Sequence, residues 1–175
     1  MTAGPSPDDV RQQMVTLFAQ VAEGYEQLRF VRIIAARLLE RAALQSGERV
    51  LDAGTGTGHV ALDAASAVRP DGHVTGIDLS AAMLAHARRK AQDAGLTHVD
   101  FQEGDAQTPA FPDASVHVVM AASVIFLVVS LDSVDKRAMK CCWSPADRAG
   151  CERRGAPDSS ATPPWSTHGP SDLPP

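Results

Sequence analysis

The sequence has little of what marks a nucleic-acid-binding protein. Its net charge is −5, and its longest basic run, Arg88-Arg89-Lys90, spans three residues. Phosphate backbones are bound by clustered Lys and Arg, and a run this short fits the solvated face of a helix better. We therefore expect no nucleic-acid partner.

Long apolar segments are lacking as well. No apolar segment follows a basic N-terminal start, so the sequence shows no signal peptide. The longest apolar run extends from Val118 to Leu131, is interrupted by Ser123 and Ser130, and is too short to cross a bilayer as a helix. We expect no membrane span and a cytoplasmic location.

Cysteine and tryptophan are missing from most of the chain. All three cysteines and both tryptophans come after Lys140, and seven of the twelve prolines come after Lys136. Residues 1–135 carry 17 acidic and 10 basic residues, a net of −7, whereas residues 136–175 carry 4 and 6, a net of +2. The last part of the chain therefore differs in composition from the rest.

What the chain does carry is a strand followed by a glycine-rich turn, at residues 49–58. Val50 and Leu51 are typical of the end of a buried strand, and Asp52 stands where that strand stops. Glycine then occupies alternate positions, at Gly54, Gly56 and Gly58, before an apolar helical pattern begins. Glycine lets the backbone turn tightly and approach a ligand, and the N–H groups that start a helix favour an anionic group.

The spacing Asp52-x-Gly54-x-Gly56-x-Gly58 resembles motif I of the class I S-adenosylmethionine-dependent methyltransferases. The resemblance implies S-adenosylmethionine as cofactor, with contacts from the whole segment: Asp52, Ala53, Gly54, Thr55, Gly56 and Gly58. A dinucleotide site with the pattern G-x-G-x-x-G would need glycine at His59 or at Ala61, so NAD is disfavoured. A glycine-rich turn without a ligand is the other alternative.

A second acid follows the next predicted strand, His73 to Asp78. Asp52 and Asp78 lie 26 residues apart, which suits one βαβ unit and brings both strand ends to one edge of the sheet. Ligands of open parallel sheets bind at that edge. By resemblance to motif II of the family, Asp78 accepts hydrogen bonds from the ribose hydroxyls. The alternative is an exposed acid with a capping role.

The adenine end of the cofactor is assigned by resemblance alone. A helix capped by Ser80 and a third strand, His98 to Glu103, follow in the chain. In the family, residues placed like Leu79 and Met83 form the walls of the adenine pocket. An Asp-Ala pair placed like Asp105 and Ala106 receives the adenine amino group. Read without the family, Met83 is a core residue and Asp105 a turn acid.

Two helices are expected before the first strand, from Asp8 to about Val21 and from about Glu26 to Leu44. Apolar residues recur at helical spacing in both: Val10, Met14, Leu17, Phe18 and Val21 in the first, and Leu28, Val31, Ile34, Leu38 and Ala42 in the second. The segment from Phe18 to Phe30 is similar to the N-terminal lid of the ubiquinone/menaquinone-biosynthesis (UbiE-type) group. That similarity places Tyr25 near the cofactor, and packing is its alternative role.

The resemblance covers about residues 10–129. In the fourth predicted strand, Val116 to Met120, His117 stands where the family usually has aspartate; we do not expect it to act as a base, because it lies near the strand's start. After Val129 the family's Pro-Gly-Gly turn and later strands are lacking. Two explanations fit this change after Val129. One is a natural truncation with an appended tail, and the other, which is favoured, is a frame shift near residue 129.

The alternation of strands and helices predicts an α/β protein, and the resemblance implies a Rossmann-like three-layer αβα parallel sheet of strand order 3-2-1-4, without strands 5–7. We expect an N-terminal helical lid at residues 1–46, an incomplete S-adenosylmethionine-binding core at 47–130 and a disordered tail at 131–175. Strand 4 would then have an open edge that favours self-association. A zinc site built from Cys141, Cys142, Cys151 and His168 lacks the usual spacing, so no metal is expected.

The function predicted from the sequence is methyl transfer from S-adenosylmethionine to a small-molecule acceptor, by a chain that is incomplete as written. No catalytic residue is assigned, because a general base depends on the acceptor. Two alternatives stay open. One is an inactive S-adenosylmethionine-binding remnant or a non-functional truncated product, and the less favoured one is a fragment of an NAD-binding dehydrogenase.

Overall fold

The structure is a computed structural model that describes residues 6–25, 27–106, 111 and 115–122. Four helices and four strands are formed in these ranges. In chain order they are α1 (Pro7–Tyr25), α2 (Arg29–Ala42), β1 (Arg49–Ala53), α3 (His59–Ala67), β2 (His73–Asp78), α4 (Ala81–Asp93), β3 (Val99–Glu103) and β4 (Val118–Met120).

The four strands form one parallel sheet in the order β3-β2-β1-β4, as the sequence predicts. The register pairs Leu51 of β1 with Thr75 of β2 and with Val119 of β4. Helix α3 connects β1 to its parallel neighbour β2, and α4 connects β2 to its parallel neighbour β3. Such βαβ connections are the usual way to join adjacent parallel strands. All strands therefore end at the same edge, which gathers Asp52 near the end of β1, Asp78 at the end of β2 and Asp105 shortly after β3.

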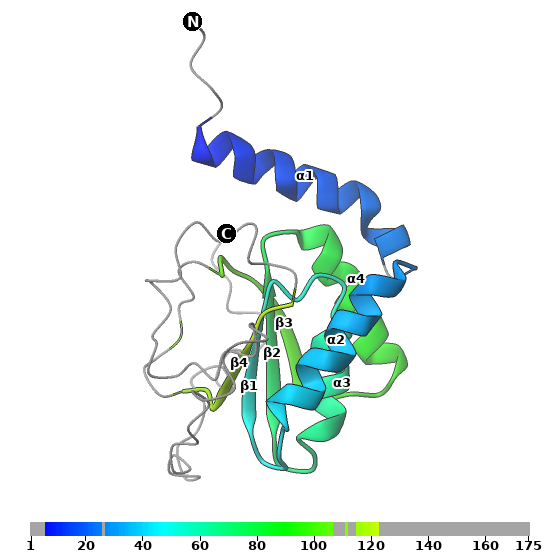
Figure 1. Ribbon diagram of the computed structural model, residues 1–175, viewed down its shortest axis with the longest axis vertical. Helices are drawn as coiled ribbons and strands as arrows, with labels where there is room; N and C mark the ends of the chain where they lie inside the picture. Colours follow the sequence, from blue (N-terminus) through cyan, green and yellow to red (C-terminus); the bar gives the residue numbers. More distant parts are fainter. Residues whose placement is uncertain (1–5, 26, 107–110, 112–114, 123–175) are drawn as a thin grey trace, which may run out of the picture.

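Helices α2, α3 and α4 cover one face of the sheet (Figure 1). Alternate strand residues point into this layer, so Val50 belongs to the larger apolar core and its neighbour Leu51 to a smaller cluster on the opposite face. The larger core is lined by many alanines of the helices, such as Ala61, Ala64 and Ala87, which are fully buried. Small side chains let the helices lie close to the sheet.

Helix α1 lies apart from this layer and crosses above the carboxyl ends of the strands (Figure 1). It packs against α4. The packed side of α1 carries Arg11, Met14, Phe18 and Ala22, of which Ala22 is 3% exposed. The sheet's acids and α1 thus lie at the same end of the molecule.

The apolar faces predicted for the two N-terminal helices are wrong in part. In α1, Val10, Leu17 and Val21 are exposed, because the apolar stripe is wider than the contact with α4 and only its Met14–Phe18 side is covered. In α2, Leu38 and Ala42 are buried as predicted, while Ile34 and the N-cap residue Leu28 are exposed. Ala35 joins Leu38 and Ala42 on the buried side of the helix, which packs against α3 and β4.

Among the helices that the structure describes, none combines the length and the apolarity that a bilayer span requires. In the same ranges, His, Cys, Asp and Glu form no group of three or more that could hold a metal ion. The tail predicted at 131–175 and the candidate zinc ligands Cys141, Cys142, Cys151 and His168 lie outside the described residues.

Candidate functional site

The loop between β1 and α3 is shaped by its glycines. Gly54, Gly56 and Gly58 all have left-handed backbones, with φ of 68°, 54° and 82°. The Thr55 N–H donates to the carbonyl of Ile77 at 2.9 Å, which ties the loop to the end of β2. A Cβ on Gly56 would meet no atom within 4 Å. The backbone at Gly56 therefore faces open space, where a ligand could approach it closely.

Gly58 has a different role in the same loop. A Cβ at this position would lie 2.8 Å from the Cβ of Ala87 and 3.0 Å from the ring of Phe101. Helix α3 begins directly after it. Only glycine lets α3 start this close to α4 and β3, so Gly58 allows the loop to pack tightly against both.

Asp78, at the end of β2, joins two loops. Its Oδ2 accepts a hydrogen bond from the Gly56 N–H at 2.8 Å, and its Oδ1 accepts one from the Ser80 N–H at 2.9 Å. Burial raises the pKa of Asp78, and the donors from Ser80 and Gly56 oppose that rise. A carboxylate offers roughly four lone-pair positions, so Asp78 retains acceptor capacity for ligand hydroxyl groups.

Asp52 is almost completely buried beneath the glycine loop, with 1% of its surface exposed. Its Oδ2 accepts from the Thr55 hydroxyl at 2.7 Å. Oδ1 makes no hydrogen bond of ordinary geometry in the described part of the chain, although the backbone N–H of Ala61 also stabilises this carboxylate. Burial raises the pKa of Asp52 to about 7; the Thr55 hydroxyl and the Ala61 N–H oppose this rise, and the negative charge of Asp78 adds to it.

Asp105 follows β3 and forms an ion pair that the sequence did not suggest. The Arg11 guanidinium of α1 lies with Nη1 2.8 Å from Asp105 Oδ2. Arg11 was not among the predicted site residues. The sequence feature that could have drawn attention to Arg11 is that it is the only basic residue of α1. The pair joins the predicted adenine end of the site to the helix above it.

Tyr25, at the end of α1, packs within its own helix. Its ring lies edge-on against Phe18, with ring centroids 5.9 Å apart and an interplanar angle of 79°. Burial and the negative charge of Asp78 both raise the pKa of Tyr25. Packing is therefore one role of Tyr25, and its place near the cofactor stays a prediction.

The remaining predicted residues lie around these acids in different environments. Leu79 is 40% exposed beside Asp78, whereas Met83 is 2% exposed and belongs to the packed interior. Ser80 caps α4 as predicted, with its Oγ 3.4 Å from the Met83 N–H. Ala106 packs against the smaller apolar cluster of the sheet. Ala53, 7% exposed, belongs to that same cluster.

His117 lies at the opposite edge of the sheet, as expected from its place in the chain. Its ring Nδ1 accepts a hydrogen bond from the Arg49 backbone N–H at 2.9 Å, and the backbone N–H of His117 donates to the Arg49 carbonyl at 2.8 Å. The imidazole thus supplies a structural acceptor where the resembling family has aspartate. It holds the beginnings of β1 and β4 together.

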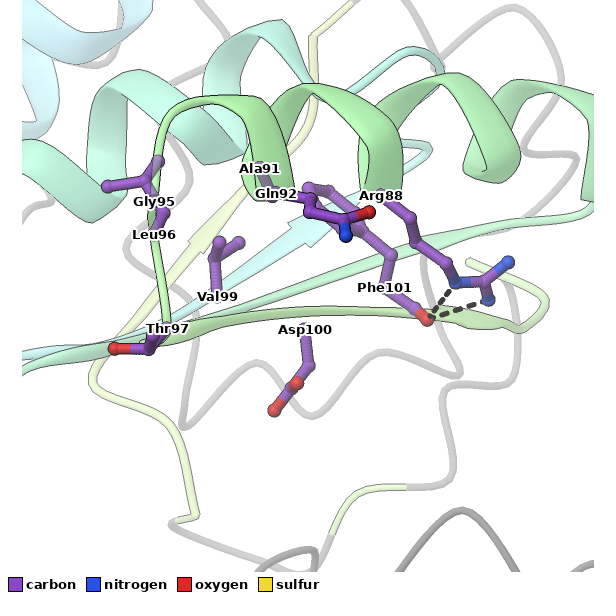
Figure 2. Close-up of a pocket in the computed structure, with 9 residues that line it drawn as sticks. All are labelled: Arg88, Ala91, Gln92, Gly95, Leu96, Thr97, Val99, Asp100 and Phe101. Atoms are coloured by element: carbon purple, nitrogen blue, oxygen red, sulfur yellow. Dashed lines mark hydrogen bonds between the residues drawn. The ribbon is translucent and has the colours of Figure 1, made fainter.

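A separate surface groove of about 410 Å³ lies between α4 and β3 (Figure 2). In it the Arg88 guanidinium donates to the Phe101 carbonyl at 2.8 and 3.2 Å, which satisfies a carbonyl on the outer edge of β3. The lining also includes Gly95, Leu96 and Thr97, at the amino-terminal side of β3. None of the predicted cofactor residues lines this groove, so it is distinct from the acid cluster.

Residues 50–143 match the family described as "Methyltransferase domain". The chain is 35% identical over 150 residues to the aklanonic acid methyltransferase DauC of Streptomyces sp. (strain C5), covering 80% of this chain and 68% of that protein. It is 31% identical over 116 residues to a demethylmenaquinone methyltransferase of Symbiobacterium thermophilum, and this match covers 62% of this chain and 46% of that protein.

Among solved structures, a crystal structure of a SAM-dependent methyltransferase from Aquifex aeolicus is similar. It has a TM-score of 0.50 and 26% sequence identity, and the match covers 55% of this chain and 51% of that one. The chain therefore spans between about half and two thirds of the length of these three relatives.

Proposed function

The chain belongs to the class I S-adenosylmethionine-dependent methyltransferases, and from this premise we propose that it transfers a methyl group from S-adenosylmethionine to a small-molecule acceptor. The observation that carries the proposal is the gathering of Asp52, Asp78 and Asp105 around one glycine loop at the carboxyl edge of the sheet. That edge is where parallel α/β sheets bind their ligands.

The residues present fit this cofactor, which supplies a methyl group activated by a positively charged sulfur. Asp78 keeps acceptor capacity for the two ribose hydroxyls, and the open backbone at Gly56 allows close approach. We assign the adenine amino group to Asp105 and the ring's surroundings to Leu79, Met83 and Ala106. The proposed set is completed by Ala53, Gly54, Thr55, Gly58 and Tyr25.

Asp52 suits the cationic part of the cofactor. Its Oδ1 is buried and makes no hydrogen bond of ordinary geometry among the described residues, and its ionised form is disfavoured by burial and by Asp78. A nearby positive charge would favour ionisation of Asp52 and would be attracted in return. We propose that Asp52 distinguishes the cofactor, which has a positively charged sulfur, from S-adenosylhomocysteine, in which the sulfur is neutral.

The acceptor is proposed to be a small molecule, because both named relatives are methyltransferases of small molecules. Catalysis would rest mainly on holding the acceptor near the activated methyl group with water excluded, which is worth up to roughly 7–11 kcal/mol in well-oriented cases. No general base is assigned to the described residues, since its need depends on the acceptor atom.

A second candidate is binding of the cofactor without turnover. The observation that favours it is that all the assigned residues within the described ranges belong to the cofactor side of the site. Methyl transfer also needs a wall that positions the acceptor, and a misplacement of about 1 Å already costs about a hundredfold in rate.

One experiment separates these candidates. Release of S-adenosylhomocysteine is followed with the full chain and a panel of small phenols, amines and quinones, and thermal shifts are recorded with S-adenosylmethionine and with NAD. Turnover with a panel member supports methyl transfer, and a shift with S-adenosylmethionine but no turnover supports the second candidate. A larger shift with NAD at equal concentration would contradict both.

A further inference from the structure

The ion pair between Arg11 and Asp105 joins residues 94 positions apart in the chain. Arg11 lies near the start of α1, and Asp105 lies just after β3. The side chains are 40% and 19% exposed, so the carboxylate is the more buried partner. The contact holds the beginning of α1 against the site rather than against the rest of the core.

The rest of α1 extends over the same end of the sheet. Tyr25, at its other end, is fourteen positions from Arg11, or about 21 Å of helix at 1.5 Å per residue. Between these ends α1 packs on α4 and crosses above the carboxyl ends of the strands (Figure 1). The contact with Asp105 thus anchors a helix that lies over the carboxyl edge.

Resting on the proposed function, we propose that the Arg11–Asp105 pair is a latch that holds α1 over the adenine end of the site. The adenine amino group then displaces Arg11 from Asp105 when the cofactor binds. Both the guanidinium and the amino group are donors, and both are directed to the same partly buried carboxylate. Ligand binding therefore has to compete with a charge-assisted hydrogen bond of 2.8 Å.

The size of the effect follows from the exposure of the pair. A partly exposed ion pair contributes little to stability and is screened by salt. Removing the guanidinium should therefore tighten binding of S-adenosylhomocysteine by about two- to fivefold at low ionic strength. The gain should disappear at about 1 M salt, where the screening length falls to roughly 3 Å.

The test is calorimetry with S-adenosylhomocysteine on the wild type, Arg11→Gln and a matched control, Arg37→Gln. Arg37 forms an equally short ion pair, 2.8 Å from Glu40, within α2 and with more than half of each side chain exposed. We expect tighter binding for Arg11→Gln alone. The analogue S-inosylhomocysteine has oxygen in place of the amino group, so it should gain no affinity from Arg11→Gln.

Hydrogen exchange without ligand tests the latch independently of binding. Backbone amides of residues 11–25 should exchange faster in Arg11→Gln than in the wild type or in Arg37→Gln. If the wild type binds S-adenosylhomocysteine but Arg11→Gln binds it equally or more weakly, displacement is overturned and the proposed function stands. Equal exchange in all three proteins overturns the latch. If the wild type does not bind, the proposed function fails together with displacement.

Discussion

The polar residues at the two ends of the parallel strands differ. We call the end where the strands begin the amino edge and the end where they finish the carboxyl edge. At the amino edge, His117 and Arg49 hydrogen-bond with each other's backbone, and the His98 ring lies 2.7 Å from the Ala65 carbonyl. At the carboxyl edge, Asp52 has a buried oxygen that makes no hydrogen bond of ordinary geometry in the described chain, and burial raises the pKa of Asp78. Hydrogen bonds at the first edge thus tie the beginnings of neighbouring strands and α3 together, whereas at the second edge burial disfavours the ionised forms of Asp52 and Asp78.

This difference indicates what each edge contributes. Acids with shifted pKa values gather at sites where proteins bind or react. The proposed function therefore assigns the carboxyl edge to a ligand and the amino edge to the stability of the sheet. Substitutions at the two edges should accordingly separate stability from binding, and the predictions below are ordered by the size of the expected effect.

The largest loss of stability is expected for Gly58→Ala, which disrupts the packing beneath the carboxyl edge. The new Cβ would lie 2.8 Å from Ala87 on a backbone with φ of 82°. Strain and overpacking together should lower the free energy of unfolding by roughly 2–6 kcal/mol. Urea unfolding measures this. Gly95→Ala is the matched control, because Gly95 has φ of 64° but open space around it, and it should lose much less.

The next effect is a pH dependence of stability caused by Asp52. Its pKa is raised from 3.8 to about 7, so the folded protein holds an extra proton between these values. Stability from this group is therefore greatest at low pH and falls as pH rises from about 4 to about 7. A shift of about three units corresponds to a loss on the order of 4 kcal/mol.

Asp52→Asn should remove this dependence. The variant should match the wild type near pH 4 and exceed its stability above pH 7, as measured by urea unfolding of both proteins across that range. Asp63→Asn on α3 serves as control, because Asp63 is exposed. Parallel pH curves for the wild type and Asp52→Asn would contradict the account of the buried acid.

A smaller loss is expected at the amino edge. His117→Ala removes the acceptor of the Arg49 N–H, and an unpaired buried donor costs about 1–3 kcal/mol. Affinity for S-adenosylhomocysteine should stay the same, because the ring lies at the edge away from the acids. Denaturant midpoints and calorimetry on the same samples test both statements. A fall in affinity without a fall in stability would reverse the assignment of the two edges.

Much of the fold could be predicted from the sequence because its signals are local. Short apolar strands, the glycines after Asp52 and the cap at Ser80 each specify a nearby piece of backbone. A parallel sheet then brings Asp52 and Asp78 to one edge without further information. The resemblance added Asp105, whose carboxylate the structure places at the end of β3, within reach of α1.

The parts that could not be predicted depend on contacts between distant segments. Arg11 gave no local sign of its partner, because the ion pair depends on how α1 crosses the sheet edge. The covered side of α1 was misjudged for the same reason, since Val10 and Leu17 share its helical period but face away from α4. The raised pKa of Asp52 likewise comes from burial that only the fold creates.

The most direct test of the account is calorimetry with S-adenosylmethionine on the wild type, Asp78→Ala and Asp63→Ala. Asp78 is assigned two ribose hydroxyls, and hydrogen bonds to a charged group contribute roughly 1.5–3 kcal/mol each. The account predicts binding by the wild type and by Asp63→Ala, with at least about a tenfold weaker affinity for Asp78→Ala. Equal affinities of Asp78→Ala and the wild type would contradict the claim that the carboxyl edge is the cofactor site.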